Sequence, residues 1–314
     1  MRFQQYILNE KSGPSATQWE ELITLAWNKL ITGGKYDDSL LKISNIKSYH
    51  NKEYLPIAEK IATKLADVVI VPTEIMKHYG SNGSKTTPFW KKITGKSSDT
   101  PKTDMIVGDH RISLKQSGGS QLMSGNRTES IATLLSTIEG NPTIMNKLIK
   151  EINSSFGKGR KLTSTKYGPI HKEIGDKIKN VLESDSDIMN KFVLETLTGI
   201  NKFGKSNLGT ATHMMVFSEN GTVKYKKIDL SLAKSLSKSV NIRVSFKSQG
   251  GMRYSSLRAG IKENINETEV FDKIGKSILD IGKKIKSLIK SGFNNLLDYL
   301  GLSIDVDISG VIEY

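Results

Sequence analysis

The chain has 314 residues, with 46 Lys and Arg against 32 Asp and Glu and no cysteine. The lack of cysteine excludes disulfides, thiol nucleophiles and cysteine-ligated zinc, and no apolar run approaches the roughly 20 residues of a membrane-spanning helix. A formal net charge of +14 favours a polyanionic partner, because clustered cations release counterions from phosphates. A lysine-rich surface that only keeps the protein solvated would give the same net charge.

Two early segments have apolar residues at helical spacing, which predicts two core helices. The first spans residues 17–31 and opens with Thr17 and Glu20 at the spacing of a capping box. The second runs from Tyr54 to Val69. Residues 80–103 are rich in Gly, Ser, Thr and Lys and are expected to form a loop that approaches the next element.

The stretch from residue 101 to 125 combines charge, strand periodicity and glycine-rich turns. Residues 105–107 and 111–115 alternate as two strands around a tight turn that opens with Gly108. Pairing across this turn makes one face of the hairpin apolar, with Met105, Val107, Ile112 and Leu114, so that face is expected to cover a core. The other face gathers Asp104, Arg111, Ser113 and Lys115, with Asp104 opposite Ser113.

This arrangement resembles the signature of the PD-(D/E)xK nuclease superfamily, with Thr103-Asp104 as the first half and Ser113-Leu114-Lys115 as the second. The resemblance spans residues 15 to 140. It implies a restriction-endonuclease-like core and a Mg²⁺- or Mn²⁺-dependent deoxyribonuclease, in which Asp104 binds the metal and Lys115 stabilises developing negative charge or positions the attacking water. The structural alternative is a cross-strand ion pair on a half-solvated hairpin.

Ser113 departs from the family pattern, since an acid usually stands there. The resemblance therefore implies that the second metal ligand comes from elsewhere, often from a glutamate on the preceding helix. By helical angle Glu20 flanks the apolar stripe, whereas Glu21 points away from it, which makes Glu20 the better candidate. Glu129 is a second candidate. Both also have a structural interpretation as capping-box residues, Glu129 with Asn126.

Several residues around the hairpin suit a nucleic acid backbone. Small residues and free amides before the helix that opens at Asn126 favour an anion, and a loop of alternating glycine and cations suits phosphates without base readout. An ordinary solvated loop would look similar in each case. The candidate nucleic-acid-binding residues are Gly118, Gly119, Gln121, Lys158, Arg160 and Lys161.

The second half begins with a predicted helix at 188–197 and continues with strands at 212–217, 222–228 and 240–247. Residues 269–300 have the pattern of a long basic amphipathic helix, which suits a membrane surface, a partner or the body of the same chain. Residues 304–314 alternate as an edge strand. A faint echo of the hairpin motif marks an alternative site, or a coincidence, formed by Glu195, Asp229 and Lys247.

These observations predict an α+β protein in three segments. Residues 1–155 form a nuclease-like mixed β-sheet flanked by helices, 156–268 a second α+β region, and 269–314 the basic helix and edge strand. The favoured function is metal-dependent DNA cleavage, with homodimerisation left open. The main alternative, which Ser113 supports, is a non-catalytic nucleic-acid-binding or virion-associated protein that keeps the fold. A membrane-active or partner-docking protein, acting through residues 269–300, is a third possibility. The expected location is the cytoplasm of a bacterial cell, or the virion if the gene belongs to a phage.

Overall fold

A computed structural model describes residues 13–34, 48–69, 74–80, 82–138, 140–158, 162–249 and 251–261. The chain divides into two compact units, Met1–Ile265 and Asn266–Tyr314, and all described residues belong to the first. The predicted helix at 269–300 and strand at 304–314 therefore lie outside the described residues. No helix in the described part combines the length and apolar character needed to cross a membrane.

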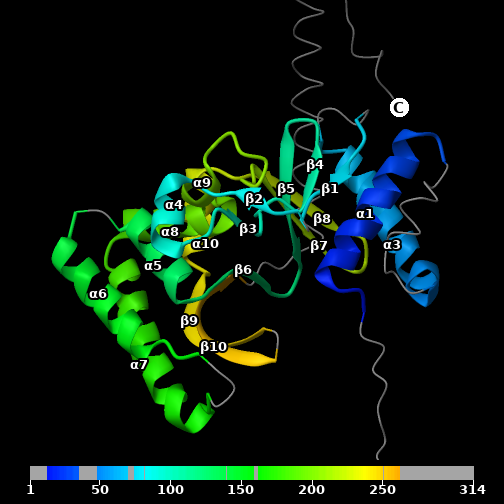
Figure 1. The fold of residues 1–314 in the computed structure, drawn as a ribbon. Helices are drawn as coiled ribbons and strands as arrows, with labels where there is room; N and C mark the ends of the chain where they lie inside the picture. The colour runs from blue at the N-terminus through cyan, green and yellow to red at the C-terminus, as the bar shows by residue number, and fades with distance from the viewer. Residues whose placement is uncertain are drawn as a thin grey trace, which may run out of the picture. The chain divides into compact units, whose positions relative to one another are not determined.

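A mixed sheet of five strands in the order β1-β4-β5-β7-β8 lies at the centre of the described fold (Figure 1). Strands β4 and β5 pair antiparallel, and β5 pairs parallel with β7. The other pairings are antiparallel. The α+β prediction is confirmed. The strands are β1 (Lys77–His78), β4 (Met105–Val107), β5 (His110–Gln116), β7 (His213–Phe217) and β8 (Val223–Lys227).

The predicted hairpin of β4 and β5 is present in the predicted register. Met105 lies opposite Ile112, and Val107 lies opposite His110. Gly108 opens the turn with a φ of 53°, a left-handed conformation that glycine adopts without a steric cost. Met105, Val107 and Ile112 are buried, so the apolar face of the hairpin covers a core as expected.

Two helices, α1 (Ala16–Ile31) and α3 (Ser48–Ala66), pack on each other and share a hydrophobic core with that face (Figure 1). The predicted capping box of α1 is wrong. Ser15 and Gln18 form it instead, because the same Ser/Thr-x-x-Glu/Gln spacing also occurs two residues earlier. This correction leaves the Glu20 side chain without a capping role.

The face of the sheet opposite α1 and α3 packs against a second hydrophobic core. Along β7, Met215 and Phe217 enter the first core, whereas Met214 and Val216 enter the second, as the alternation of a strand requires. A three-stranded sheet in the order β6-β10-β9 also contributes to the second core. Its strands are β6 (Ser120–Gly125), β9 (Asn241–Gln249) and β10 (Met252–Ile261), and the helices around the second core are α5 (Arg127–Thr137), α6 (Pro142–Ser155), α7 (Ser164–Glu183), α8 (Ser186–Thr198) and α10 (Leu230–Ser237).

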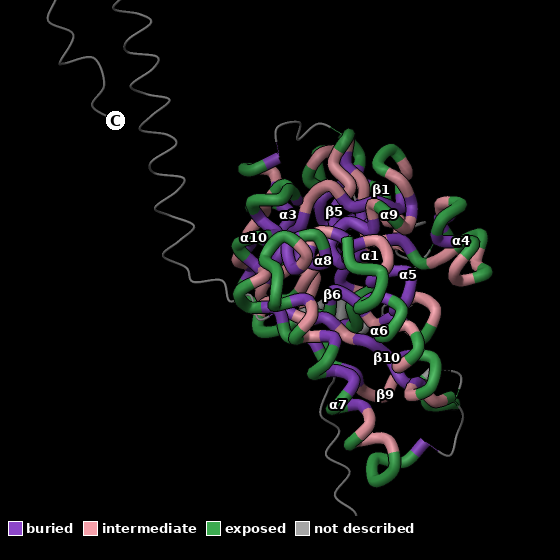
Figure 2. Tube along the Cα trace, turned by 90° about the vertical axis from the view of Figure 1, so that its left-hand side faces the viewer, coloured by how far each residue is buried: buried purple, intermediate pink, exposed green. Residues whose placement is uncertain are grey.

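Helix α7 shows the pattern of such a core helix, because buried residues recur along it at helical spacing between exposed ones (Figure 2). Helices α6 and α7 flank the predicted loop of alternating glycine and cations at 156–161. Residues 159–161 of that loop lie outside the described residues.

The predicted loop at 80–103 is wrong in part. It contains the short helix α4 (Pro88–Thr94), which begins at the N-cap Thr87, and the paired strands β2 (Ser84–Lys85) and β3 (Ser98–Asp99). Trp90 on α4 is buried, so it packs in the interior. A further short helix, α9 (Ile200–Phe203), contacts α4.

Strands from both halves of the chain share each of the larger sheets, since β5 pairs with β7 and β6 pairs with β10. A functional division near residue 155 stays a prediction.

Candidate active site

The polar face of the hairpin brings Asp104, Ser113 and Lys115 together. Leu114 N donates to Asp104 Oδ2 at 2.6 Å, and Ser113 Oγ donates to the same oxygen at 3.4 Å. Lys115 Nζ lies 3.9 Å from Asp104 Oδ2 and donates to Ser113 Oγ at 2.7 Å. Ser113 is buried, and its hydroxyl bridges the lysine and the aspartate. Arg111, in contrast, donates to the carbonyls of Lys205 and Asn207.

Helix α1 brings Glu20 to this cluster. A Cβ added to Gly80 would lie 2.6 Å from Glu20 Oε2 and 3.5 Å from the Cα of Asp104, so the Glu20 carboxylate and Asp104 flank the same glycine. The Glu20 side chain is only 10% exposed, and His78 Nε2 lies 2.9 Å from its Oε2. We call Glu20, His78, Asp104, Ser113 and Lys115 the hairpin site. His78 was not expected from the sequence.

The charges of the hairpin site act on one another. Burial raises the pKa of Glu20, the hydrogen bond from His78 opposes that rise, and the charges of Asp104 and Lys115 act with opposite signs. The hydrogen bond to Glu20 in turn raises the pKa of His78. A protonated His78 imidazole would neutralise the Glu20 carboxylate, whose charged form burial penalises. A cation bound between the two carboxylates would serve the same purpose.

The donor set of the hairpin site fits a hard divalent cation. Within the described ranges, no group of three or more His, Cys, Asp or Glu side chains is arranged to hold a metal. Glu20 and Asp104 supply carboxylate oxygens and no soft donor. Mg²⁺ is typically held by one or two carboxylates and keeps several waters, whereas a structural zinc needs four protein ligands. The two carboxylates therefore suit Mg²⁺ or Mn²⁺.

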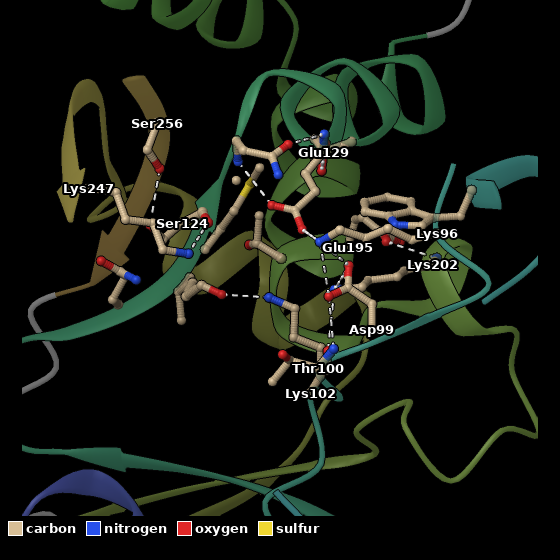
Figure 3. A pocket seen from close by; sticks show the side chains of 18 of the residues that line it. Lys96, Asp99, Thr100, Lys102, Ser124, Glu129, Glu195, Lys202, Lys247 and Ser256 are labelled. Atoms are coloured by element: carbon tan, nitrogen blue, oxygen red, sulfur yellow. Dashed lines mark hydrogen bonds and ion pairs between the residues drawn. The ribbon is translucent and has the colours of Figure 1, made fainter. Parts of the chain in front are cut away.

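Glu129 does not join the hairpin site. It forms the predicted capping box with Asn126 at the start of α5, and its Oε1 accepts a hydrogen bond from Lys96 Nζ at 2.6 Å. Glu129 lines a cavity of about 720 Å³ beside the short helices α4 and α9 (Figure 3).

The alternative site of the second half is not assembled as a unit. Asp229 caps α10 by accepting from Leu232 N at 2.9 Å. Glu195 and Lys247 line the same cavity as Glu129. The Glu195 carboxylate accepts from Asn201 N at 2.8 Å and from Lys202 N at 3.2 Å, so it anchors the start of α9.

Burial raises the pKa of Glu195 to about 7, which predicts a pH-dependent stability. Between pH 4.5 and 7 the folded protein binds more protons at this carboxyl than the unfolded chain does, so the free energy of unfolding falls as the pH rises. Glu195→Gln cannot titrate and should remove this loss, which amounts to about 2 kcal/mol between pH 5 and 7. Urea unfolding of both proteins from pH 5 to 7 would measure it. Parallel pH profiles would contradict the prediction, and the exposed Glu183→Gln is the control.

The predicted nucleic-acid-binding residues lie in three places. Gly118 and Gly119 form an exposed turn between β5 and β6, with φ of 94° and 150°. Gln121 is exposed at the edge of the cavity. Lys158 bridges to Tyr254 on β10, and Arg160 and Lys161 lie outside the described residues. A role of these residues in nucleic acid binding stays a prediction.

No protein-family model and no curated protein matches the chain. Among solved structures, the chain is similar to a crystal structure of the restriction endonuclease MspI in complex with its cognate DNA. The similarity covers 69% of this chain and 82% of that chain, at 12% sequence identity and a TM-score of 0.37.

Proposed function

We propose that the protein is a metal-dependent DNA endonuclease that hydrolyses phosphodiester bonds at the hairpin site. The observation that carries the proposal is the meeting of three charged groups from separate elements. Glu20 of α1 lies beside Asp104, and the Asp104 carboxylate lies 3.9 Å from Lys115 Nζ. Two carboxylates and a lysine at one point supply the ligands for a divalent cation and a positive charge for the transition state.

Each residue of the hairpin site has a role in this chemistry. Glu20 and Asp104 would hold the Mg²⁺, which polarises the phosphate and lowers the pKa of a bound water. Lys115 stabilises the negative charge that develops on the phosphate oxygens. Ser113 positions Lys115 and Asp104 through its hydroxyl. His78 orients Glu20 through its hydrogen bond to Oε2.

The net charge of +14 supports a polyanionic substrate. A second candidate function is favoured by a specific observation. Ser113 stands where an acid would add a further oxygen ligand, so the hairpin site has two carboxylates rather than three. A DNA-binding protein that keeps the site geometry without cleavage is the function that this observation supports.

Cleavage is expected to require a divalent cation. The purified protein should nick or cut DNA with Mg²⁺ or Mn²⁺ and not with excess EDTA, because all the proposed ligands are oxygens. Gel assays on duplex, single-stranded and branched DNA would measure it, with DNA binding followed in parallel. Binding without cleavage of any of these substrates in either metal would favour the DNA-binding function.

A further inference from the structure

The cavity beside the hairpin site is lined by residues from eight helices and strands and from the connections between them, and the mechanism proposed above uses none of these residues. It measures about 720 Å³, within the usual range for small-molecule sites. Lysines and carboxylates both line it (Figure 3). Its chemistry depends on which of these charges are already paired.

The three carboxylates of the cavity are paired within the protein. Asp99 lies 3.0 Å from Lys202 Nζ and 3.4 Å from Lys96 Nζ. Glu129 accepts from Lys96 Nζ at 2.6 Å and from Asn126 N at 2.9 Å. Glu195 accepts the two amides at the start of α9. A cationic ligand would have to displace these interactions.

Two lysines of the cavity donate hydrogen bonds to backbone carbonyls instead of pairing with a carboxylate. Lys102 Nζ donates to Leu122 O at 2.6 Å, and Lys247 Nζ donates to Ser124 O at 3.2 Å. Both acceptors are backbone carbonyls of β6 (Figure 3). Across the described part of the chain, no ion pair joins either ammonium to a carboxylate. A protonated lysine amine has three N–H donors, so each of the two has capacity for a ligand oxygen beyond its carbonyl. Burial lowers the pKa of Lys102 to about 7, and a dianionic ligand would favour its charged form.

A third donor lines the same cavity. Trp90 is 3% exposed, and its Nε1 is buried without a hydrogen-bond partner among the described residues. An unpaired buried donor destabilises the fold, and a ligand acceptor that reached it would remove that cost. The hydroxyls of Ser124 and Ser256, 3.0 Å apart on β6 and β10, add two more polar groups to the wall.

We propose that this cavity binds a phosphomonoester group through Lys102 and Lys247. A phosphomonoester carries close to two negative charges at neutral pH and three terminal oxygens, which matches two ammonium groups and further donors. A phosphodiester within an intact strand carries one charge and two such oxygens. The same group is present on a free nucleotide and on the phosphorylated end of a DNA strand. The binding does not depend on catalysis at the hairpin site.

The proposal is tested by calorimetry on the full chain in EDTA, so that no metal bridges a ligand to the hairpin site. Deoxythymidine monophosphate should bind at least about tenfold more tightly than thymidine, which corresponds to about 1.4 kcal/mol. Lys247→Met keeps the aliphatic stem, removes the charge and should weaken binding of the monophosphate about tenfold. Lys234→Met on the exposed side of α10 is the matched control.

Two oligothymidylates, one with a 5′-phosphate and one with a 5′-hydroxyl, identify the source of the group. Tighter binding of the 5′-phosphorylated strand than of the 5′-hydroxyl strand would assign the cavity to a DNA end, and equal binding of the two strands would assign it to a free nucleotide. Equal affinities for thymidine and its monophosphate would overturn the proposal. So would a Lys247→Met protein that folds as judged by circular dichroism and binds the monophosphate as wild type does.

Discussion

Asp104→Asn is expected to reduce DNA cleavage about a thousandfold while DNA binding persists. The change keeps the volume of the side chain and leaves an oxygen that can accept from Leu114 N, so the hairpin should fold. It removes the charge that would bind the metal and that faces Lys115. A bound metal ion supplies several kcal/mol of transition-state stabilisation, and about 4 kcal/mol corresponds to a thousandfold in rate.

Single-turnover cleavage in Mg²⁺ would measure the loss, and gel shifts in Ca²⁺ would measure binding. Asp109→Asn is the matched control, because Asp109 is exposed in the turn of the same hairpin and its substitution should leave the rate unchanged. An Asp104→Asn protein that cuts DNA as fast as wild type would remove the hairpin site from consideration and leave the cavity as the next place to search.

The hairpin site was largely predictable because most of its information is local. Alternating apolar residues and a glycine turn define the register of β4 and β5, and the register alone brings Asp104, Ser113 and Lys115 to one face. Glu20 required one further step, the angle of its side chain around α1. The structure places Glu20 beside Asp104, although the capping box of α1 differs from the predicted one, and a role of Glu20 as a metal ligand stays a prediction.

His78 was not predictable by the same means. Strand β1 has two residues, too few for any periodicity, and its pairing with β4 crosses a long sequence separation. For Glu129 the local spacing was the better guide, because the Asn-x-x-Glu pattern predicts the capping box that the structure shows. Its bond to Lys96 depends on the tertiary fold and could not be read from that pattern.

The sequence alone predicts neither strand β6 nor the cavity, for related reasons. Residues 117–125 are rich in Ser and Gly, which indicates a loop, yet 120–125 form a strand because β10 pairs with them. The residues of the cavity come from elements between residues 90 and 256 and have no common spacing. Only the tertiary fold brings the side chains of Lys102 and Lys247 to neighbouring backbone carbonyls of β6.

Glu20→Gln is the second substitution expected to have a large effect on cleavage. It removes one of the two carboxylates. At about 1 mM Mg²⁺ it should lower the rate of DNA cleavage about a hundredfold, which corresponds to about 3 kcal/mol. The Mg²⁺ concentration that gives half of the maximal rate should rise. This shift distinguishes a metal ligand from a residue that only supports the fold.

The stability of the same variant provides an independent measurement. Burial raises the pKa of Glu20, so the folded protein disfavours its charged form, and a neutral glutamine should not lower the free energy of unfolding at pH 8. Glu21→Gln, one residue along α1, is the matched control and should change neither the rate nor the Mg²⁺ dependence. A Glu20→Gln protein with an unchanged Mg²⁺ dependence and a lower free energy of unfolding would make Glu20 a structural partner of His78, and Asp104 would then need another ligand beside it.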